Sequence, residues 1–247
     1  MTKVAPQVWL QKIALVAGLA VMLTSTGHTA DSSGNGTTNN NVVSNNMANA
    51  KLAINKNGVK VWTYQTPDNP AFSYRATTVL NTSLTSAVAV ITDTKSLTQW
   101  VPYVSHIDVV ERDADERNFI LHMELDFPFP LQDRDVVVRG KITQAADGVV
   151  TIQNNAITDS RVPVKPNVVR LTHYEGDWTL RPLGPNKVEV STTGFGDPGG
   201  LIPLAVANRF IQQQPYQMLG RMKNYVKNAR YQNAQLDFIR DPYAKKK

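Results

Sequence analysis

Cysteine is missing from the whole 247-residue sequence, and its absence removes several kinds of chemistry at once. The chain has no disulfide, no thiolate nucleophile or metal ligand, and no thiol to which a lipid anchor is attached. Long apolar runs are scarce as well: residues 13–23 form a run of 11, whereas a helix that spans a bilayer needs about 20. A folded part of this chain must therefore be stabilised by its apolar core.

Motifs of several enzyme classes are also missing. There is no Gly-x-Ser-x-Gly elbow, no His-Glu-x-x-His helix and no glycine-rich phosphate loop. We therefore expect no catalytic residues, no metal site and no cofactor.

The charge balance is only mildly basic, with a net charge of +6. Part of this charge comes from Lys245, Lys246 and Lys247, which favour a solvated basic tail over residues 241–247. Such a tail is attracted weakly to anionic membrane surfaces. We expect transient membrane contact as one use of this tail, and no nucleic-acid partner.

The N-terminus has the pattern of an export signal. Lys3 and Lys12 flank the start of the apolar run at 13–23, and small and polar residues follow it. This pattern predicts a cleaved signal peptide over residues 1–30, and a periplasmic or secreted location; a retained anchor is the alternative. Residues 31–46 are rich in Asn, Ser and Gly, which predicts a flexible leader.

The rest of the chain, residues 47–240, is long enough for one domain with a sizeable core, and no repeat or linker divides it. Its apolar periodicity predicts about seven antiparallel strands, because the two-residue period recurs in run after run. The predicted elements are a helix at 47–55, strands at 59–65 and 72–80, two helices within 83–100, strands at 118–126, 134–143, 148–157, 169–181 and 187–195, and a last helix at 202–231, kinked or broken near Pro215.

The alternation in residues 118–126 gives the predicted sheet one apolar face. Phe119, Leu121 and Met123 share that face, and a long amphipathic last helix is suited to cover it. The predicted fold class is therefore α+β, a helix-grip in which a curved antiparallel sheet wraps around a long C-terminal helix.

Three ordered motifs support this fold. They are FPFPLQDRD at 127–135, VVRLTHYEGDWTLRPL at 168–183 and FGDPGGLIPLAVAN at 195–208, with tryptophans at 62 and 100. Together they resemble the START (StAR-related lipid-transfer) domain family, in an exported bacterial form. The resemblance implies a monomeric, non-enzymatic protein that encloses a hydrophobic lipid between the sheet and the last helix, for carriage or sensing in the cell envelope.

Alternation and the family pattern together nominate positions that face this lipid, although a dry core is the alternative for an apolar stripe of this kind. The candidate lipid-binding residues are Trp100, Phe119, Leu121, Met123, Val136, Val138, Arg170, Tyr174, Trp178, Ile211, Met218 and Met222.

The usual ligand anchors of the family are absent. Phosphatidylcholine-binding members have an Arg and an Asp where this chain has Leu97 and Val101, and sterol-type members have an Arg where it has Gly140. A sterol, fatty acyl or other headgroup-poor lipid is therefore expected. Arg170 is a candidate substitute anchor, since it shares a face with Tyr174 if no bulge intervenes.

Other polar positions have structural interpretations. Arg134 and Asp135 point to opposite faces of a strand and are expected to pin loops, while His122 and Glu124 are expected on an exposed outer face. The family resemblance makes the loops at 162–167 and 195–203 candidate gates. Related helix-grip folds include cyclases and hydrolases, so an enzyme acting on an apolar small molecule is the alternative function.

Overall fold

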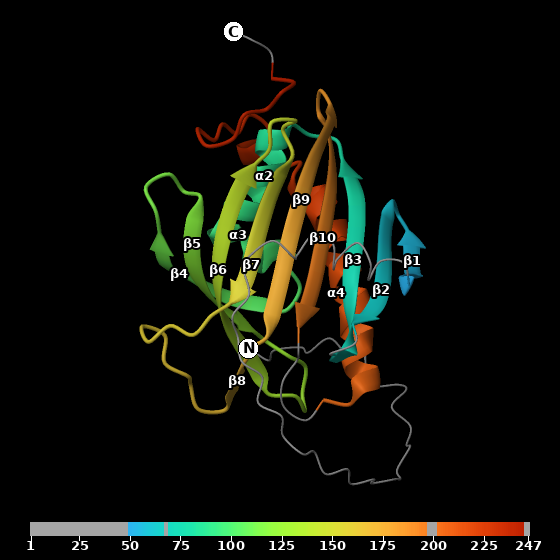
Figure 1. Cartoon of the computed structure of the whole chain (residues 1–247), viewed down its shortest axis with the longest axis vertical. Helices are drawn as coiled ribbons and strands as arrows, with labels where there is room; N and C mark the ends of the chain where they lie inside the picture. Colours follow the sequence, from blue (N-terminus) through green and yellow to red (C-terminus); the bar gives the residue numbers. More distant parts are fainter. Residues whose placement is uncertain (1–48, 67–68, 197–201, 245–247) are drawn as a thin grey trace, which may run out of the picture. The chain divides into compact units, whose positions relative to one another are not determined.

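The computed structural model describes residues 49–66, 69–196 and 202–244 (Figure 1). The predicted signal peptide, the leader and the last three lysines lie outside these residues. The elements are β1 (Lys51–Lys56), β2 (Val59–Thr66), β3 (Asn69–Leu80), α2 (Leu84–Thr92), α3 (Thr94–Trp100), β4 (Val104–Arg112), β5 (Asn118–Leu125), β6 (Asp133–Gln144), β7 (Val150–Ala156), β8 (Val168–Arg170), β9 (Tyr174–Gly184), β10 (Lys187–Gly196), α4 (Leu204–Tyr225) and a 3-10 turn (Ala229–Tyr231).

The described strands form one sheet in the order β1-β2-β3-β10-β9-β7-β6-β5-β4, with β8 added beside β6. All neighbours on the main path are antiparallel, and only β8 runs parallel to its partner. The sheet is curved, and α4 lies against its inner face (Figure 1). The prediction of an α+β helix-grip fold is confirmed, with more strands than the seven expected.

The predicted helix at 47–55 is wrong, because most of it is strand. β1 pairs with β2 through a tight turn at Asn57 and Gly58, whose φ angles are 54° and 72°. Asn-Gly with both residues at positive φ is the preferred two-residue hairpin turn, so this turn places β1 beside β2.

The two helices predicted within residues 83–100 are present as α2 and α3. The Ser83 hydroxyl accepts a hydrogen bond from the backbone N–H of Ser86 (3.1 Å), as an N-cap residue does. The Asp241 carboxylate accepts another from the N–H of Leu84 (2.9 Å). The side-chain packing of the domain therefore continues beyond residue 240, where it was expected to end.

The last helix is shorter and more regular than predicted. α4 runs without a break from Leu204 to Tyr225, although Pro215 lies inside it and supplies no N–H to the helix. Residues 226–228 leave the helix, and Asn228 then caps the 3-10 turn by accepting a hydrogen bond from the N–H of Arg230. The predicted break near Pro215 is therefore wrong, and the alternative, a kink, stays a prediction.

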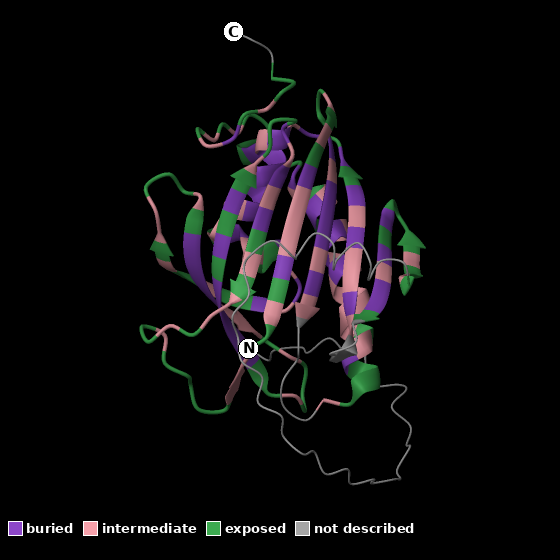
Figure 2. Ribbon diagram, viewed as in Figure 1, coloured by how far each residue is buried: buried purple, intermediate pink, exposed green. Residues whose placement is uncertain are grey.

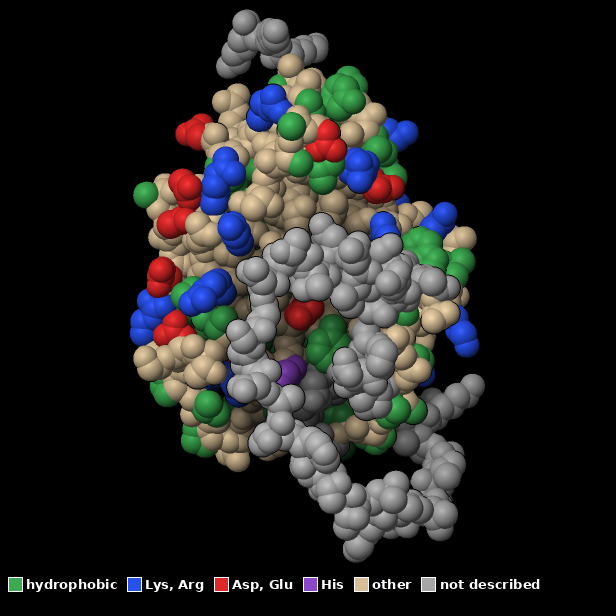
Figure 3. Space-filling model, viewed as in Figure 1, with side chains coloured by type: hydrophobic (Ala, Val, Ile, Leu, Met, Phe, Trp, Pro, Cys, Tyr) green, Lys and Arg blue, Asp and Glu red, His purple; other side chains and the backbone are tan. Residues whose placement is uncertain are grey.

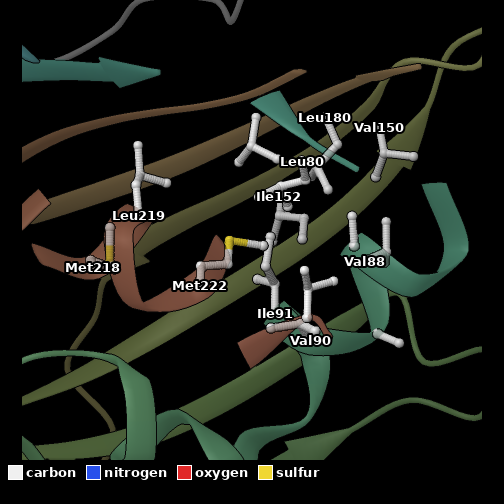
Figure 4. Close-up of a cluster of buried hydrophobic side chains, with 14 of the residues drawn as sticks. Leu80, Val88, Val90, Ile91, Val150, Ile152, Leu180, Met218, Leu219 and Met222 are labelled. Carbon is white, nitrogen blue, oxygen red and sulfur yellow. The ribbon is translucent and has the colours of Figure 1, made fainter. Parts of the chain in front are cut away.

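Buried residues alternate with more exposed ones along β2 and the second half of β6, as the two-residue period requires, whereas residues 119–122 of β5 and 134–138 of β6 are buried on both faces (Figure 2). Basic and acidic side chains are interspersed on the outer face of the sheet (Figure 3). On the inner face, Leu219 and Met222 of α4 are fully buried beside side chains of the sheet and of α2 (Figure 4). This part of the core is packed, and the space that remains lies toward the other half of α4.

Candidate ligand cavity

A cavity of about 240 Å³ lies between the inner face of the sheet, α3 and the first part of α4. Its lining is mainly apolar, because the inward positions of β5 and β6 carry large aliphatic and aromatic side chains. Strand β5 contributes Phe119, Leu121, Met123 and Leu125, and α4 contributes Ala207, Phe210, Ile211, Gln214 and Met218.

Nine of the twelve predicted lipid-facing residues line this cavity. Contact with a lipid at these positions stays a prediction. The nine are Phe119, Leu121, Met123, Val136, Val138, Tyr174, Trp178, Ile211 and Met218.

Trp100 and Met222 are buried but lie behind the lining. Trp100 packs edge-on against Trp178, with 6.2 Å between ring centroids, and therefore supports a ring that does face the cavity. Met222 is fully buried in the packed core. These two residues therefore belong to the packed core and do not line the cavity.

Arg170 does not reach the cavity, so its prediction as a ligand anchor is corrected. Its Nε and Nη2 atoms donate to the two carboxylate oxygens of Asp135 at 2.7 and 2.8 Å. The reason is that β8 pairs parallel with β6, which sets Arg170 opposite Asp135, and the chain leaves the sheet at residues 171–173 before β9 begins. Arg170 and Tyr174 therefore belong to separate strands and do not share a face.

Asp135 is the centre of a buried polar cluster on the outer side of β6. It is fully buried, and Nε2 of His122 lies 2.9 Å from its Oδ2 atom. Burial alone raises the pKa of the Asp135 carboxyl, but hydrogen bonds from Arg170 and His122 more than offset this and hold that pKa below its usual value. The predicted structural role of the Arg-Asp motif agrees with these contacts.

His122 is on the predicted outer face but is not exposed, with 5% of its surface accessible. The segment at 157–167 covers it, and ion pairs fasten this segment to the sheet: Lys165 pairs with Glu124, and Arg161 pairs with Glu111 at 2.9 Å. Residues 162–167 therefore pack on the outer side and do not line the cavity as a gate.

The second predicted gate, 195–203, falls largely outside the described residues, although Phe195 lines the cavity.

One rim of the cavity is formed by the rings of Tyr103, Phe127 and Phe210. Their centroids lie 5.2 to 5.7 Å apart, so they form one aromatic cluster. The Arg134 guanidinium lies over the Phe127 ring at 4.7 Å and holds this cluster to β6.

Two tyrosines that line the cavity, Tyr74 and Tyr174, lie over glycines that leave room for them. A Cβ atom on Gly176 would lie 2.3 Å from the Tyr174 hydroxyl oxygen, and one on Gly194 would lie 2.4 Å from the Tyr74 ring. Gly194 pairs with both Gly176 and Tyr74 across adjacent strands. Burial raises the pKa of Tyr74 to about 12 and also raises the pKa of Tyr174, so both hydroxyls are neutral at physiological pH.

The same row continues toward the edge of the sheet. Asn154 pairs with Gly140, Gly140 with Phe119, and Phe119 with Arg112 at the end of β4. Arg112 lines the cavity but was not predicted, because the strand that carries it, β4, was not among the predicted strands. The cross-strand pairing with Phe119 is the signal that identifies it.

Among the described residues, no group of three or more His, Asp or Glu side chains is arranged to hold a metal ion. No described helix is long and apolar enough to cross a bilayer. The site is thus a mainly apolar space whose wall carries a few polar groups, among them two tyrosine hydroxyls, Arg112 and Glu175.

A curved sheet that holds such a cavity against one long helix defines a helix-grip ligand-binding protein. The START domain family model matches residues 51–231, and the chain belongs to this family.

The chain is also similar to individual proteins and solved structures. An uncharacterised protein of Pseudomonas aeruginosa is 26% identical over 174 residues, covering 70% of this chain and 85% of that protein. The mitochondrial StAR-related lipid transfer protein 7 of Mus musculus is 28% identical over 134 residues, covering 53% of this chain and 36% of that longer protein. A crystal structure of a STAR-related lipid transfer protein from Xanthomonas axonopodis superimposes with a TM-score of 0.67 at 25% identity, covering 72% of this chain and 99% of that one.

Proposed function

We propose that this protein binds a single hydrophobic lipid in the cavity and carries or senses it in the cell envelope, without catalysing a reaction. The observation that carries the proposal is the lining itself: inward residues of β5, β6 and α4 enclose an apolar space that a polar solute would not fill favourably. Relatives of this chain include StAR-related lipid transfer proteins, which supports the same class of ligand.

The polar cluster around His122 and Asp135 favours no catalytic function. It lies on the side of β5 and β6 that faces away from the cavity, because His122 alternates with Leu121 and Met123 along the strand. A substrate held in the cavity does not meet it. The cluster fastens the 157–167 segment and β8 to the sheet, which is a structural role.

Transient contact with a membrane is part of the proposal, because apolar side chains are exposed next to the cavity rim. Phe129, two residues after the rim residue Phe127, is 96% exposed. Leu204 and Val206 in the first turn of α4 are 47% and 38% exposed, and Ala207 beside them lines the cavity. Exposed apolar groups around an opening are suited to enter a bilayer surface while lipid is exchanged.

Export, cleavage of residues 1–30 and a monomeric state complete the proposal. The signal-like N-terminus supports export and the cleavage of residues 1–30. Cell fractionation tests export, and the mass of the mature chain tests cleavage. Light scattering tests the monomeric state. An uncleaved chain in the cytoplasm would contradict the envelope location without affecting the cavity.

The lipid itself is tested by purifying the mature protein from its own host and analysing an organic extract by mass spectrometry. The expected result is one co-purifying lipid class in stoichiometric amount. Leu121→Trp fills the centre of the cavity and is expected to reduce the bound lipid at least roughly tenfold, because several apolar contacts are lost. Val79→Trp, on the outer face and 39% exposed, is the matched control.

No extractable lipid from the wild type, together with no uptake of sterols or fatty acids from vesicles, would overturn the proposal. Equal lipid content in Leu121→Trp and wild type would place the ligand elsewhere. A thermal melt of each variant shows whether the larger side chain is accommodated.

A further inference from the structure

The cavity wall carries one cationic side chain among the lining residues that the structure describes, and it belongs to Arg112. Arg112 is the last residue of β4 and stands directly opposite Phe119 of β5. Its guanidinium carbon lies 5.8 Å from the centroid of the Phe119 ring, so the ring holds the charge at the cavity wall. The side chain is 25% exposed, which leaves it largely withdrawn from solvent.

Within the part of the chain that the structure describes, the Arg112 guanidinium donates no hydrogen bond to another residue. Its one ionic partner among the described residues is Glu116, at 3.9 Å between Nη1 and Oε2, and the Glu116 side chain is 53% exposed. An ion pair this long and this exposed contributes little, on the order of 1 kcal/mol or less. Arg170, in contrast, is bound by two short bonds to Asp135.

The other charged residue of the lining does not neutralise Arg112. Glu175 is exposed on β9, and β7, β6 and β5 separate its strand from β4 in the sheet. Leu97 and Val101 of the facing helical segment are apolar and also line the cavity. Among the described lining residues, the wall near β4 therefore presents one positive charge beside apolar side chains, with the exposed Glu116 carboxylate at 3.9 Å as its ionic partner. An anion held against the apolar lining is attracted to this charge more strongly than it is in water.

We propose that Arg112 binds the anionic headgroup, a carboxylate or a phosphate monoester, of a single-chain lipid whose tail lies along β5. This inference rests on the proposed lipid-binding function and specifies the ligand class. A planar guanidinium with free N–H groups binds both kinds of oxyanion in a bidentate manner.

The direction of the tail follows from the register of β5. Arg112 is opposite Phe119, and Val104 at the other end of β4 is opposite Leu125. Between these ends Leu121 and Met123 continue the apolar lining. From Phe119 to Leu125 a strand extends about 20 Å, which is comparable to the length of a long acyl chain.

The size of the cavity favours one chain over two. Its volume of about 240 Å³ is below the roughly 300–1,000 Å³ typical of sites for drug-sized ligands. A lipid with two acyl chains needs more space than a single-chain lipid. The headgroup lies at Arg112, and the tail ends near the aromatic rim formed by Tyr103, Phe127 and Phe210.

The experiment compares three lipids with the same 18-carbon tail, oleate, oleyl phosphate and oleyl alcohol, by displacement of a fluorescent fatty acid from delipidated protein. The variants are Arg112→Gln, Arg112→Lys and the control Arg139→Gln, which changes an exposed arginine on the outer face of β6. We expect the wild type and Arg139→Gln to bind both anions roughly tenfold more tightly than the alcohol, as a charged hydrogen bond predicts.

Arg112→Gln is expected to lose this tenfold preference while it binds oleyl alcohol as the wild type does, which also shows that its cavity is intact. Arg112→Lys is expected to keep part of the preference. Equal affinity of the wild type for all three lipids, or an unchanged preference in Arg112→Gln, would overturn the inference and leave lipid binding standing. Displacement by inorganic phosphate alone would show a phosphate site and overturn it as well. Failure of every lipid to bind would overturn the proposed function itself.

Discussion

The ring of Phe119 occupies the space that a side chain on Gly140 would need: a Cβ atom there would lie 2.0 Å from two ring carbons. The two residues are direct partners across β5 and β6. Sterol-type members of the family are expected to have an arginine at this position. In this protein an arginine at position 140 would clash with the Phe119 ring. A larger residue at 140 has to displace the ring that lines the cavity and supports Arg112.

Gly140→Ala is therefore expected to lower the free energy of unfolding by about 1–3 kcal/mol, the usual cost of overpacking. Urea denaturation measures it. The control is Gly220→Ala in α4, where an added Cβ meets nothing within 4 Å and is expected to stabilise the helix by up to about 1 kcal/mol. If Gly140→Ala leaves the free energy of unfolding unchanged, the Phe119 ring moves freely.

Regular strands are where the sequence predicts the site well. Phe119, Leu121 and Met123 face the cavity as expected, because β5 pairs with β6 without any register irregularity. Under that condition the two-residue period determines which face each side chain occupies. The last helix was predicted from a different period, since its apolar positions recur at three and four residues.

The sequence did not predict the place of a residue where that place depends on which other segment of the chain packs or pairs with it. Arg170 was placed in the cavity because residues 169–181 read as one strand, but a parallel pairing with β6 separates it from Tyr174. His122 was assigned to the correct face, yet the distant segment 157–167 buries it. Arg112 was missed because no strand was predicted at residues 104–112, where β4 lies. The contacts that decide the places of Arg170 and His122 join residues that are distant in the sequence.

The buried carboxylate of Asp135 is expected to make stability depend on pH. Because hydrogen bonds from Arg170 and His122 outweigh the effect of burial and hold its folded-state pKa below 3.8, the ionised form stabilises the fold. This contribution is complete above the unfolded-state pKa, which is about 3.9, and is lost as pH falls through the lower folded-state value.

Asp135→Asn is accordingly expected to lower the free energy of unfolding by about 3 kcal/mol at pH 7, since it leaves Arg170 without its buried partner. Urea denaturation at pH 7 and pH 3 measures the difference, which should shrink at pH 3. The matched control is Asp237→Asn, an exposed carboxylate for which no change is expected. An equal loss at both pH values would show that the charge of Asp135 is not the cause.

Phe129 is expected to matter for delivery of lipid and not for its binding. It is 96% exposed and stands two residues from the cavity rim, so it is placed to enter a membrane surface. Phe129→Ser should weaken binding to anionic vesicles roughly tenfold, because burying one Phe side chain is worth about 1.5–3 kcal/mol. Vesicle sedimentation measures this, with lipid displacement in solution as the second readout.

Leu183→Ser provides the control for this experiment. Leu183 is 43% exposed in β9 near the turn to β10, and this hairpin lies at the opposite end of the sheet from α4's first turn (Figure 1). It should bind vesicles as the wild type does. If both variants lose vesicle binding equally, general surface hydrophobicity drives the contact; if neither does, the rim is not the membrane-facing surface. Only a loss confined to Phe129→Ser, with lipid affinity unchanged, assigns the contact to the rim.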